Sequence, residues 1–153
     1  MIEVQVLVSE CDRKVISHIK KAATATLEIT GEHKTYALTI SIGSDEFLHE
    51  LNKTYRDTDR PTDVLSFSED YVIPGTSTIY LGDIAISYPT AVAQAAEAGH
   101  AVANELSLLT VHGVLHLLGF DHQDDDQKQE MWALQHQVLD GLGIKMAHFS
   151  GDE

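Results

Sequence analysis

Residues 103–118 form a very apolar stretch that is long enough for a helix of about four turns. Two of its polar residues, His112 and His116, are four positions apart, which places both imidazoles on one face of a helix. Gly119 is suited to end the helix, because glycine adopts the left-handed conformation at little cost, and the chain can then turn back to present His122. The spacing therefore predicts a metal site at the end of an apolar helix.

The three histidines predict one Zn²⁺ ion per chain, with another divalent metal as the alternative. Three neutral nitrogen ligands leave a fourth coordination position for water, as in catalytic zinc sites. The competing interpretation is a set of buried core histidines. That interpretation does not explain why a helix-ending glycine is placed so that a third histidine can join the first two, whereas a metal site does. The nearby Asp121 either orients a ligand histidine or stabilises the turn.

Gly113 directly follows the first histidine, at the position where zinc proteases carry their catalytic glutamate. Without that carboxylate, the helix offers a peptidase no side chain to pass a proton to the departing amine. An anionic phosphodiester substrate would instead be repelled by a carboxylate, whereas an arginine would attract it and bind its oxygens. Lys53, Arg56 and Arg60 are spaced three and four apart, and they either supply that charge or form a solvated surface. The pattern weakens the protease interpretation and leaves phosphoryl chemistry open.

The rest of the chain mixes strand and helix patterns. Alternating apolar and polar residues predict four strands, at about 2–8, 36–42, 63–67 and 78–87. Amphipathic spacing and capping residues predict five helices, at about 12–29, 45–55, 88–98, 103–118 and 124–140. Residues 69–77 are expected to be irregular, with a turn at Pro74 and Gly75. We therefore expect one α/β (mixed α+β) domain over residues 1–153, with a small, mostly four-stranded sheet packed against about five helices.

The net charge of −14 at first argues against a nucleic-acid partner, because phosphate binding draws on clustered lysine and arginine. Residues 1–60, however, hold eight of the ten basic residues and ten acidic ones, whereas residues 61–153 hold two basic and fourteen acidic ones. An anionic ligand should therefore approach over the N-terminal part. The single Cys11, the lack of a long apolar run and the lack of a signal-peptide pattern predict a cytoplasmic protein with no membrane association.

Three blocks of the sequence resemble the YbeY family of bacterial metal-dependent endoribonucleases, the rRNA maturation factors. The blocks are LNKTYRDTDRPTDVLSF, LGDIAIS and VHGVLHLLGFDH, and they lie in the family's order over about residues 45–140. Carried over by motif, the metal ligands fall on the three histidines named above. The arginine that the family uses for activity falls on Arg56. The acidic residue of the glycine-aspartate pair falls on Asp83, which either supports the metal site or is structural.

The resemblance implies a zinc-binding domain that cleaves single-stranded RNA, matures the 3′ end of 16S rRNA and acts in ribosome quality control. It also implies that the partners are single-stranded rRNA and the ribosome or small-subunit components, and not DNA. Phe120 replaces a usual tyrosine, and Asp57 and Thr58 replace a usual glycine and lysine, so the patch around Arg56 is less basic here. Arg56 is expected to stabilise charge on the phosphoryl oxygens. Whether water or the ribose 2′-hydroxyl attacks phosphorus is left open.

The sequence leaves two other functions open. A zinc-dependent peptidase or amidase would have to recruit its base from outside the helix, with Asp83 or Asp121 as candidates. A non-enzymatic ribosome-assembly factor would use a structural metal only to hold the helix end, and its binding to rRNA or ribosomal protein would survive substitution of His122. Peptide and RNA substrates, tested with and without a chelator, separate these alternatives from an endoribonuclease.

Overall fold

The structure, a computed structural model, describes residues 1–29 and 34–145. Its elements follow one another as β1 (Ile2–Val6), α1 (Val15–Glu28), β2 (Tyr36–Gly43), α2 (Asp45–Arg56), β3 (Val64–Val72), β4 (Ile79–Ser87), α3 (Tyr88–Ala98), α4 (Val102–Leu117) and α5 (Asp125–Gly141). The predicted mixed α/β fold, with four strands and five helices in the described part, is confirmed. The predicted domain extends to residue 153, and residues 146–153 lie outside the described residues.

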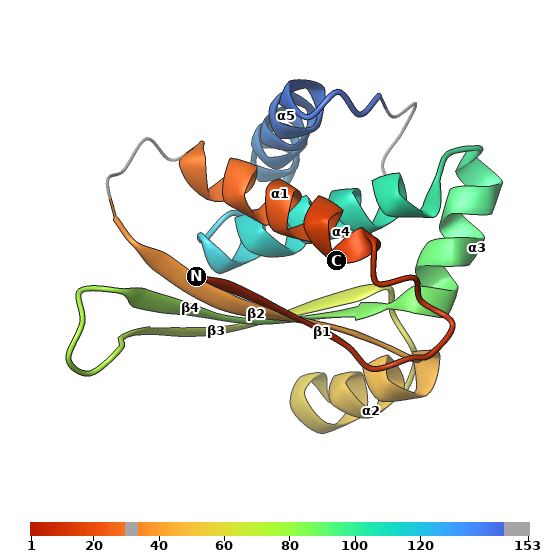
Figure 1. Cartoon of the computed structure of the whole chain (residues 1–153), viewed down its shortest axis with the longest axis horizontal. Coiled ribbons are helices and arrows are strands. Elements are labelled where there is room, and N and C mark those ends of the chain that lie inside the picture. The colour runs from red at the N-terminus through yellow and green to blue at the C-terminus, as the bar shows by residue number, and fades with distance from the viewer. Residues whose placement is uncertain (30–33, 146–153) are drawn as a thin grey trace.

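The four strands form one sheet in the order β1-β2-β4-β3 (Figure 1). β1, β2 and β4 are parallel, and β3 pairs antiparallel with β4. Helix α1 makes the crossover between the parallel strands β1 and β2. β3 is an edge strand of the described sheet, so one side of it has no neighbouring strand.

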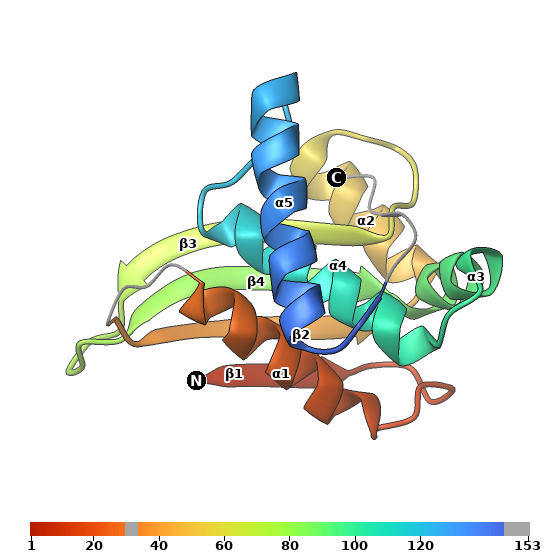
Figure 2. The same ribbon diagram turned by 90° about the horizontal axis from the view of Figure 1, so that it is seen from above.

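The helices cover the two faces of the sheet unequally. α1, α4 and α5 lie on one face, and α2 lies on the other (Figures 1 and 2). α4 is the central helix, because it packs against α1, α3, α5, β3 and β4. A helix with partners on nearly every side has to be apolar nearly all round, which explains the composition of residues 103–118. Within the described chain, the helices are too short or too polar to span a bilayer.

Strand β3 extends further than the sequence predicts. We expected a strand over 63–67 and irregular chain over 69–77, but the strand continues to Val72. The register shifts between Ser68 and Tyr71, and Asp70 has a left-handed φ of 52°. A bulge of this kind breaks the apolar–polar alternation on which the prediction relied. The irregular assignment is therefore wrong for residues 69–72, whereas the predicted turn at Pro74 and Gly75 is present.

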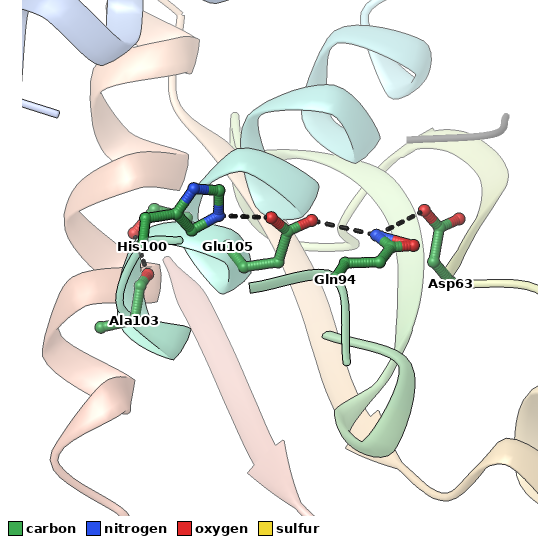
Figure 3. Close-up of polar contacts among 6 residues, drawn as sticks. Asp63, Gln94, His100, Ala103 and Glu105 are labelled. Carbon is green, nitrogen blue, oxygen red and sulfur yellow. Dashed lines mark hydrogen bonds and ion pairs between the residues drawn. The ribbon is translucent and has the colours of Figure 1, made fainter. Parts of the chain in front are cut away.

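A buried polar network joins α3, α4 and the segment before β3 (Figure 3). The side-chain amide of Gln94 donates to Asp63 Oδ2 at 3.3 Å and to Glu105 Oε2 at 3.0 Å. His100 Nε2 lies 2.7 Å from Glu105 Oε1. Both carboxylates are almost completely buried, so these hydrogen bonds offset the cost of removing them from water. The network holds the N-terminal part of α4, the helix whose C-terminal part carries two of the three histidines.

Gly82 lies where β4 passes very close to β3, and we expect its replacement by alanine to be strongly destabilising. A Cβ atom at this position would lie 2.1 Å from the backbone oxygen of Phe67, and the φ of Gly82 is +144°. Gly82→Ala should lower the free energy of unfolding by about 3 kcal/mol or more, because backbone strain and overpacking add.

Urea unfolding measures this loss, and Gly99→Ala is the matched control. Gly99 also has a positive φ, of +76°, but a Cβ atom added there would meet no neighbouring atom within 4 Å. It should therefore lose only about 1 kcal/mol, from strain alone. Equal losses in the two variants would show that the close approach of β3 to β4 does not matter.

Candidate metal centre

The structure brings the three predicted ligand histidines together at the end of α4. His112 and His116 lie one turn apart on that helix, and His122 follows the turn that ends it. Gly119 has a φ of +102°, and the backbone N–H of Phe120 donates to the carbonyl of Leu115 at 3.0 Å. The chain thus reverses as the spacing predicts. One ring nitrogen from each histidine lies within 4.8 Å of the corresponding nitrogens of the other two.

The geometry of the three rings fits a metal ion. His112 Nε2 and His116 Nε2 are 3.2 Å apart. Tetrahedral Zn–N bonds of about 2.0–2.1 Å would place two ligand nitrogens about 3.3 Å apart. His122 Nε2 is buried and forms no hydrogen bond within the described chain, which is costly unless something else satisfies it. An ion that prefers imidazole ligands, zinc among them, would satisfy this nitrogen.

Gln135 of α5 orients the first of the three histidines. Its side-chain oxygen lies 2.6 Å from His112 Nδ1, and both side chains are almost completely buried. Because an amide oxygen only accepts hydrogen bonds, Nδ1 carries the proton and Nε2 keeps its lone pair for a metal. Sequence reasoning missed Gln135. The available signal was a polar residue on the inward face of the last helix, between Met131 and Val138.

We expect Gln135→Ala to weaken metal binding by about 10- to 100-fold, which is the usual effect of removing a partner that orients a ligand histidine. Competition for Zn²⁺ against a chromogenic chelator measures the change. Gln135→Glu is the matched control, because its carboxylate still accepts the hydrogen bond from His112, and its affinity should not fall below that of the unsubstituted protein. Unchanged affinity in Gln135→Ala would rule out the orienting role.

Gly113 faces the sheet and leaves no space for a larger side chain. A Cβ atom there would lie 3.0 Å from Ile84 Cγ2 and 3.3 Å from Ser66 Oγ. The hydroxyl of Ser66 also donates to the carbonyl oxygen of Gly113 at 3.0 Å, which ties α4 to β3. The residue that replaces the protease glutamate therefore allows the helix to approach the sheet closely. A glutamate at this position would have to displace the side chains of Ile84 and Ser66.

Arg56 lines the same cleft as His116 and His122, at the edge of the sheet. It lies in the last turn of α2, on the face opposite α4 (Figure 1). Its guanidinium donates to the backbone oxygen of Ser66 on the edge strand β3, and its Cζ lies 5.3 Å from the centre of the Phe67 ring. A cleft of about 310 Å³ is lined by side chains from both faces, namely Arg56, Ser66, Ser68, His116, Asp121 and His122. The structure thus places the predicted cation and two of the three predicted ligands, His116 and His122, at one cleft.

The two acidic candidates lie in different places. Asp121 lines the histidine cleft, and its Oδ1 accepts a hydrogen bond from the backbone N–H of His122 at 2.7 Å, as the turn-stabilising interpretation requires. Asp83 lines a separate cleft beside α2. Neighbouring residues of a strand point to opposite faces, and on β4 it is Ile84 that meets α4. The structure therefore does not bring Asp83 to the metal ligands.

Asp83 is instead paired with Tyr80 of the same strand, whose hydroxyl donates to Asp83 Oδ1. Burial is the largest cause, and this hydrogen bond the second, of the shift that raises the pKa of Tyr80 to about 12. The phenol therefore keeps its proton at neutral pH and holds one oxygen of the Asp83 carboxylate in place. This pairing agrees with the structural alternative for Asp83.

The fold is thus that of a mixed α/β protein with three histidines at the end of its central helix that could hold a metal ion. An arginine lines the cleft beside two of them. The family model described as Endoribonuclease YbeY matches residues 3–143 of this chain. The chain belongs to the YbeY endoribonuclease family, as the sequence blocks predicted.

Individual relatives agree with this assignment. The Endoribonuclease YbeY of Roseiflexus castenholzii is 45% identical over 131 residues, which cover 82% of each chain. The Endoribonuclease YbeY of Brevibacillus brevis is 36% identical over an alignment that covers 94% of this chain and 99% of its own. The solution structure of TM1509 from Thermotoga maritima superposes with a TM-score of 0.60 at 27% identity, covering 94% of this chain and 90% of the other.

Proposed function

We propose that this protein is a metal-dependent endoribonuclease that cleaves single-stranded RNA, with one Zn²⁺ ion per chain. The observation that carries the proposal is that Arg56 lines one cleft with His116 and His122, two of the three clustered histidines. The endoribonuclease names of its relatives support RNA as the substrate. The absence of space for a glutamate at Gly113 argues against a peptidase built like the zinc proteases.

The residues of the cleft have distinct roles in this proposal. His112, His116 and His122 would hold the ion, which when bound supplies a Lewis acid and a nucleophile at neutral pH. Arg56 would bind phosphoryl oxygens with the N–H groups that it does not use on Ser66. Because negative charge grows on these oxygens as the reaction proceeds, Arg56 stabilises the transition state more than the bound substrate.

We further propose that the substrate is rRNA, and that the protein acts in maturation of the 16S rRNA 3′ end and in ribosome quality control. Membership of the YbeY family supports this setting, with small-subunit components as partners in the cytoplasm. DNA and membranes are not expected as partners. Residues 1–153 would form a single endoribonuclease domain, in which Asp121 supports the metal site by stabilising the turn that presents His122.

The test uses purified protein on single-stranded RNA, duplex RNA and single-stranded DNA, with a chelator and with Zn²⁺ restored. We expect cleavage of single-stranded RNA alone, lost with the chelator and regained with the metal. His116→Ala, purified in parallel, controls for contaminating ribonuclease. A 2′,3′-cyclic phosphate on the product implicates the ribose hydroxyl as the nucleophile, and a 5′-phosphate implicates water.

Two outcomes would contradict the proposal. Intact RNA together with hydrolysis of a peptide substrate would identify a peptidase or amidase. Intact RNA together with rRNA binding that survives substitution of His122 would identify an assembly factor with a structural metal.

A further inference from the structure

A second cleft lies on the face of the sheet opposite the histidines, between α2 and the strands β3 and β4. Its volume is about 350 Å³, which is within the range of small-molecule sites. The cleft is lined by apolar and aromatic side chains with few polar groups, among them Phe47, Leu51, Tyr55, Phe67, Asp83 and Ala85. The metal ligands do not line it, so it has no part in the chemistry proposed above.

An aromatic pair, the exposed Tyr55 and the partly buried Phe67, lines this cleft. Tyr55 is 67% exposed, although it is a large aromatic residue on a helix that packs against the sheet. Its ring meets the Phe67 ring edge to face, with the centroids 5.6 Å apart and an angle of 69° between the planes. Edge-to-face packing leaves a face of the tyrosine ring available for stacking with a flat ligand.

The cleft also presents a hydrogen-bond acceptor. Tyr80 donates to Oδ1 of Asp83, and Oδ2 forms no hydrogen bond within residues 1–29 and 34–145. Glu69 lines the same cleft together with Ser41, so both charged groups of the lining are carboxylates. An acidic lining repels a phosphate but favours a neutral ring that carries an amino group.

The two clefts are lined by neighbouring residues at the edge of the sheet. Arg56 follows Tyr55 directly, lines the histidine cleft and lies over the Phe67 ring. Ser66 and Ser68 of β3 line the histidine cleft, whereas Phe67 between them lines the second cleft. A strand of RNA that crosses this edge would have its phosphate at Arg56 and a base on the other face.

We propose that the cleft beside α2 holds one nucleobase of the RNA strand whose phosphate lies at the histidine cleft. Tyr55 stacks on the base, and Asp83 accepts a hydrogen bond from its exocyclic amino group. Cytosine, adenine and guanine carry such a group, whereas uracil presents a carbonyl oxygen that the carboxylate disfavours. The proposal rests on the endoribonuclease function and adds a base preference to it.

The first experiment measures binding of short 2′-O-methyl RNA oligonucleotides to the metal-loaded protein, with oligonucleotide integrity checked on a gel. A single abasic site is moved along the strand. At one position it should weaken binding by roughly tenfold, which is typical of one stacked base. Tyr55→Ala should weaken binding of the intact strand by a similar factor and show no further loss with the abasic strand. Tyr55→Phe, which keeps the ring, is the matched control and should bind like the unsubstituted protein.

The second experiment compares cytosine with uracil at that position. The unsubstituted protein should bind the cytosine strand about fivefold or more tightly, because the two bases differ in the group that faces the carboxylate. Asp83→Asn should lose this preference, because an amide both donates and accepts.

Three results would overturn the proposal. If Tyr55→Ala and the abasic site weakened binding independently, so that their factors multiplied, the cleft would not hold a base. The same would follow if an abasic site weakened binding at no position of the strand. A protein side chain would then be the better occupant. If Asp83→Asn preferred cytosine as strongly as the unsubstituted protein does, the carboxylate would not be the group that recognises the base. In each of these cases the enzyme would still cleave RNA, whereas a protein that neither binds nor cleaves RNA would refute the endoribonuclease function itself.

Discussion

His116→Ala is expected to lose the bound metal and to cleave RNA at least 100-fold more slowly than the unsubstituted protein. Removing a residue that merely orients a ligand costs about 10- to 100-fold, and removing a ligand should cost more. This variant lacks His116 Nε2, which lies 3.2 Å from His112 Nε2, and keeps only two of the three clustered histidines. Elemental analysis should find about one metal ion per chain in the unsubstituted protein and almost none in the variant.

His136→Ala is the matched control for this prediction. His136 is an exposed histidine on α5, outside the group of three. The control should keep its metal and its activity, which would show that the loss in His116→Ala is specific to the site. A His116→Ala protein with a full complement of metal would contradict the assignment of this residue as a ligand.

Arg56→Ala is expected to lower kcat by about 100- to 1,000-fold while the metal content stays unchanged. This is the usual range for removing one group that stabilises charge in a transition state. Arg56→Lys should recover only part of the rate, because an ammonium keeps the positive charge but cannot match two phosphoryl oxygens with a planar fork. Single-turnover cleavage under metal-replete conditions separates this effect from weaker substrate binding.

Lys53→Ala is the control for general loss of positive charge. Lys53 lies on the same helix as Arg56 but does not line the histidine cleft. Its substitution should raise KM modestly at low salt and leave kcat unchanged. If Arg56→Ala also changed only KM, the arginine would contribute to substrate binding and not to the chemical step.

The short-range features of the site could be predicted from the sequence. His112 and His116 are one helical turn apart, so their common face follows from helix geometry alone. Gly119 allows the reversal that brings His122 to them, and this too depends on a few consecutive residues. The helix boundaries were predicted well for the same reason, and α1, which begins at Val15 and not near 12, shows the usual error at helix ends.

Features that join distant residues were not predicted. Gln135 lies 23 residues from His112, and their contact depends on how α5 crosses α4. Asp83 was a candidate to support the metal ligands, but it lies on the other face of the sheet, because a strand alternates its side chains and Ile84 is the residue that meets α4. The bulge in β3 also depends on pairing with β4, which the β3 sequence alone does not specify.

The sequence by itself thus predicted the fold class and, through its three blocks, the family. It also predicted that three candidate ligand histidines meet at one helix end, because helix periodicity and a helix-ending glycine act over a few neighbouring residues. Only the tertiary structure decided that Arg56 lines one cleft with His116 and His122, that Gln135 orients His112, and that Asp83 faces a second cleft. These relations depend on strand order and on which face of each element is buried. Both are set by packing of the whole chain, and local spacing does not encode them.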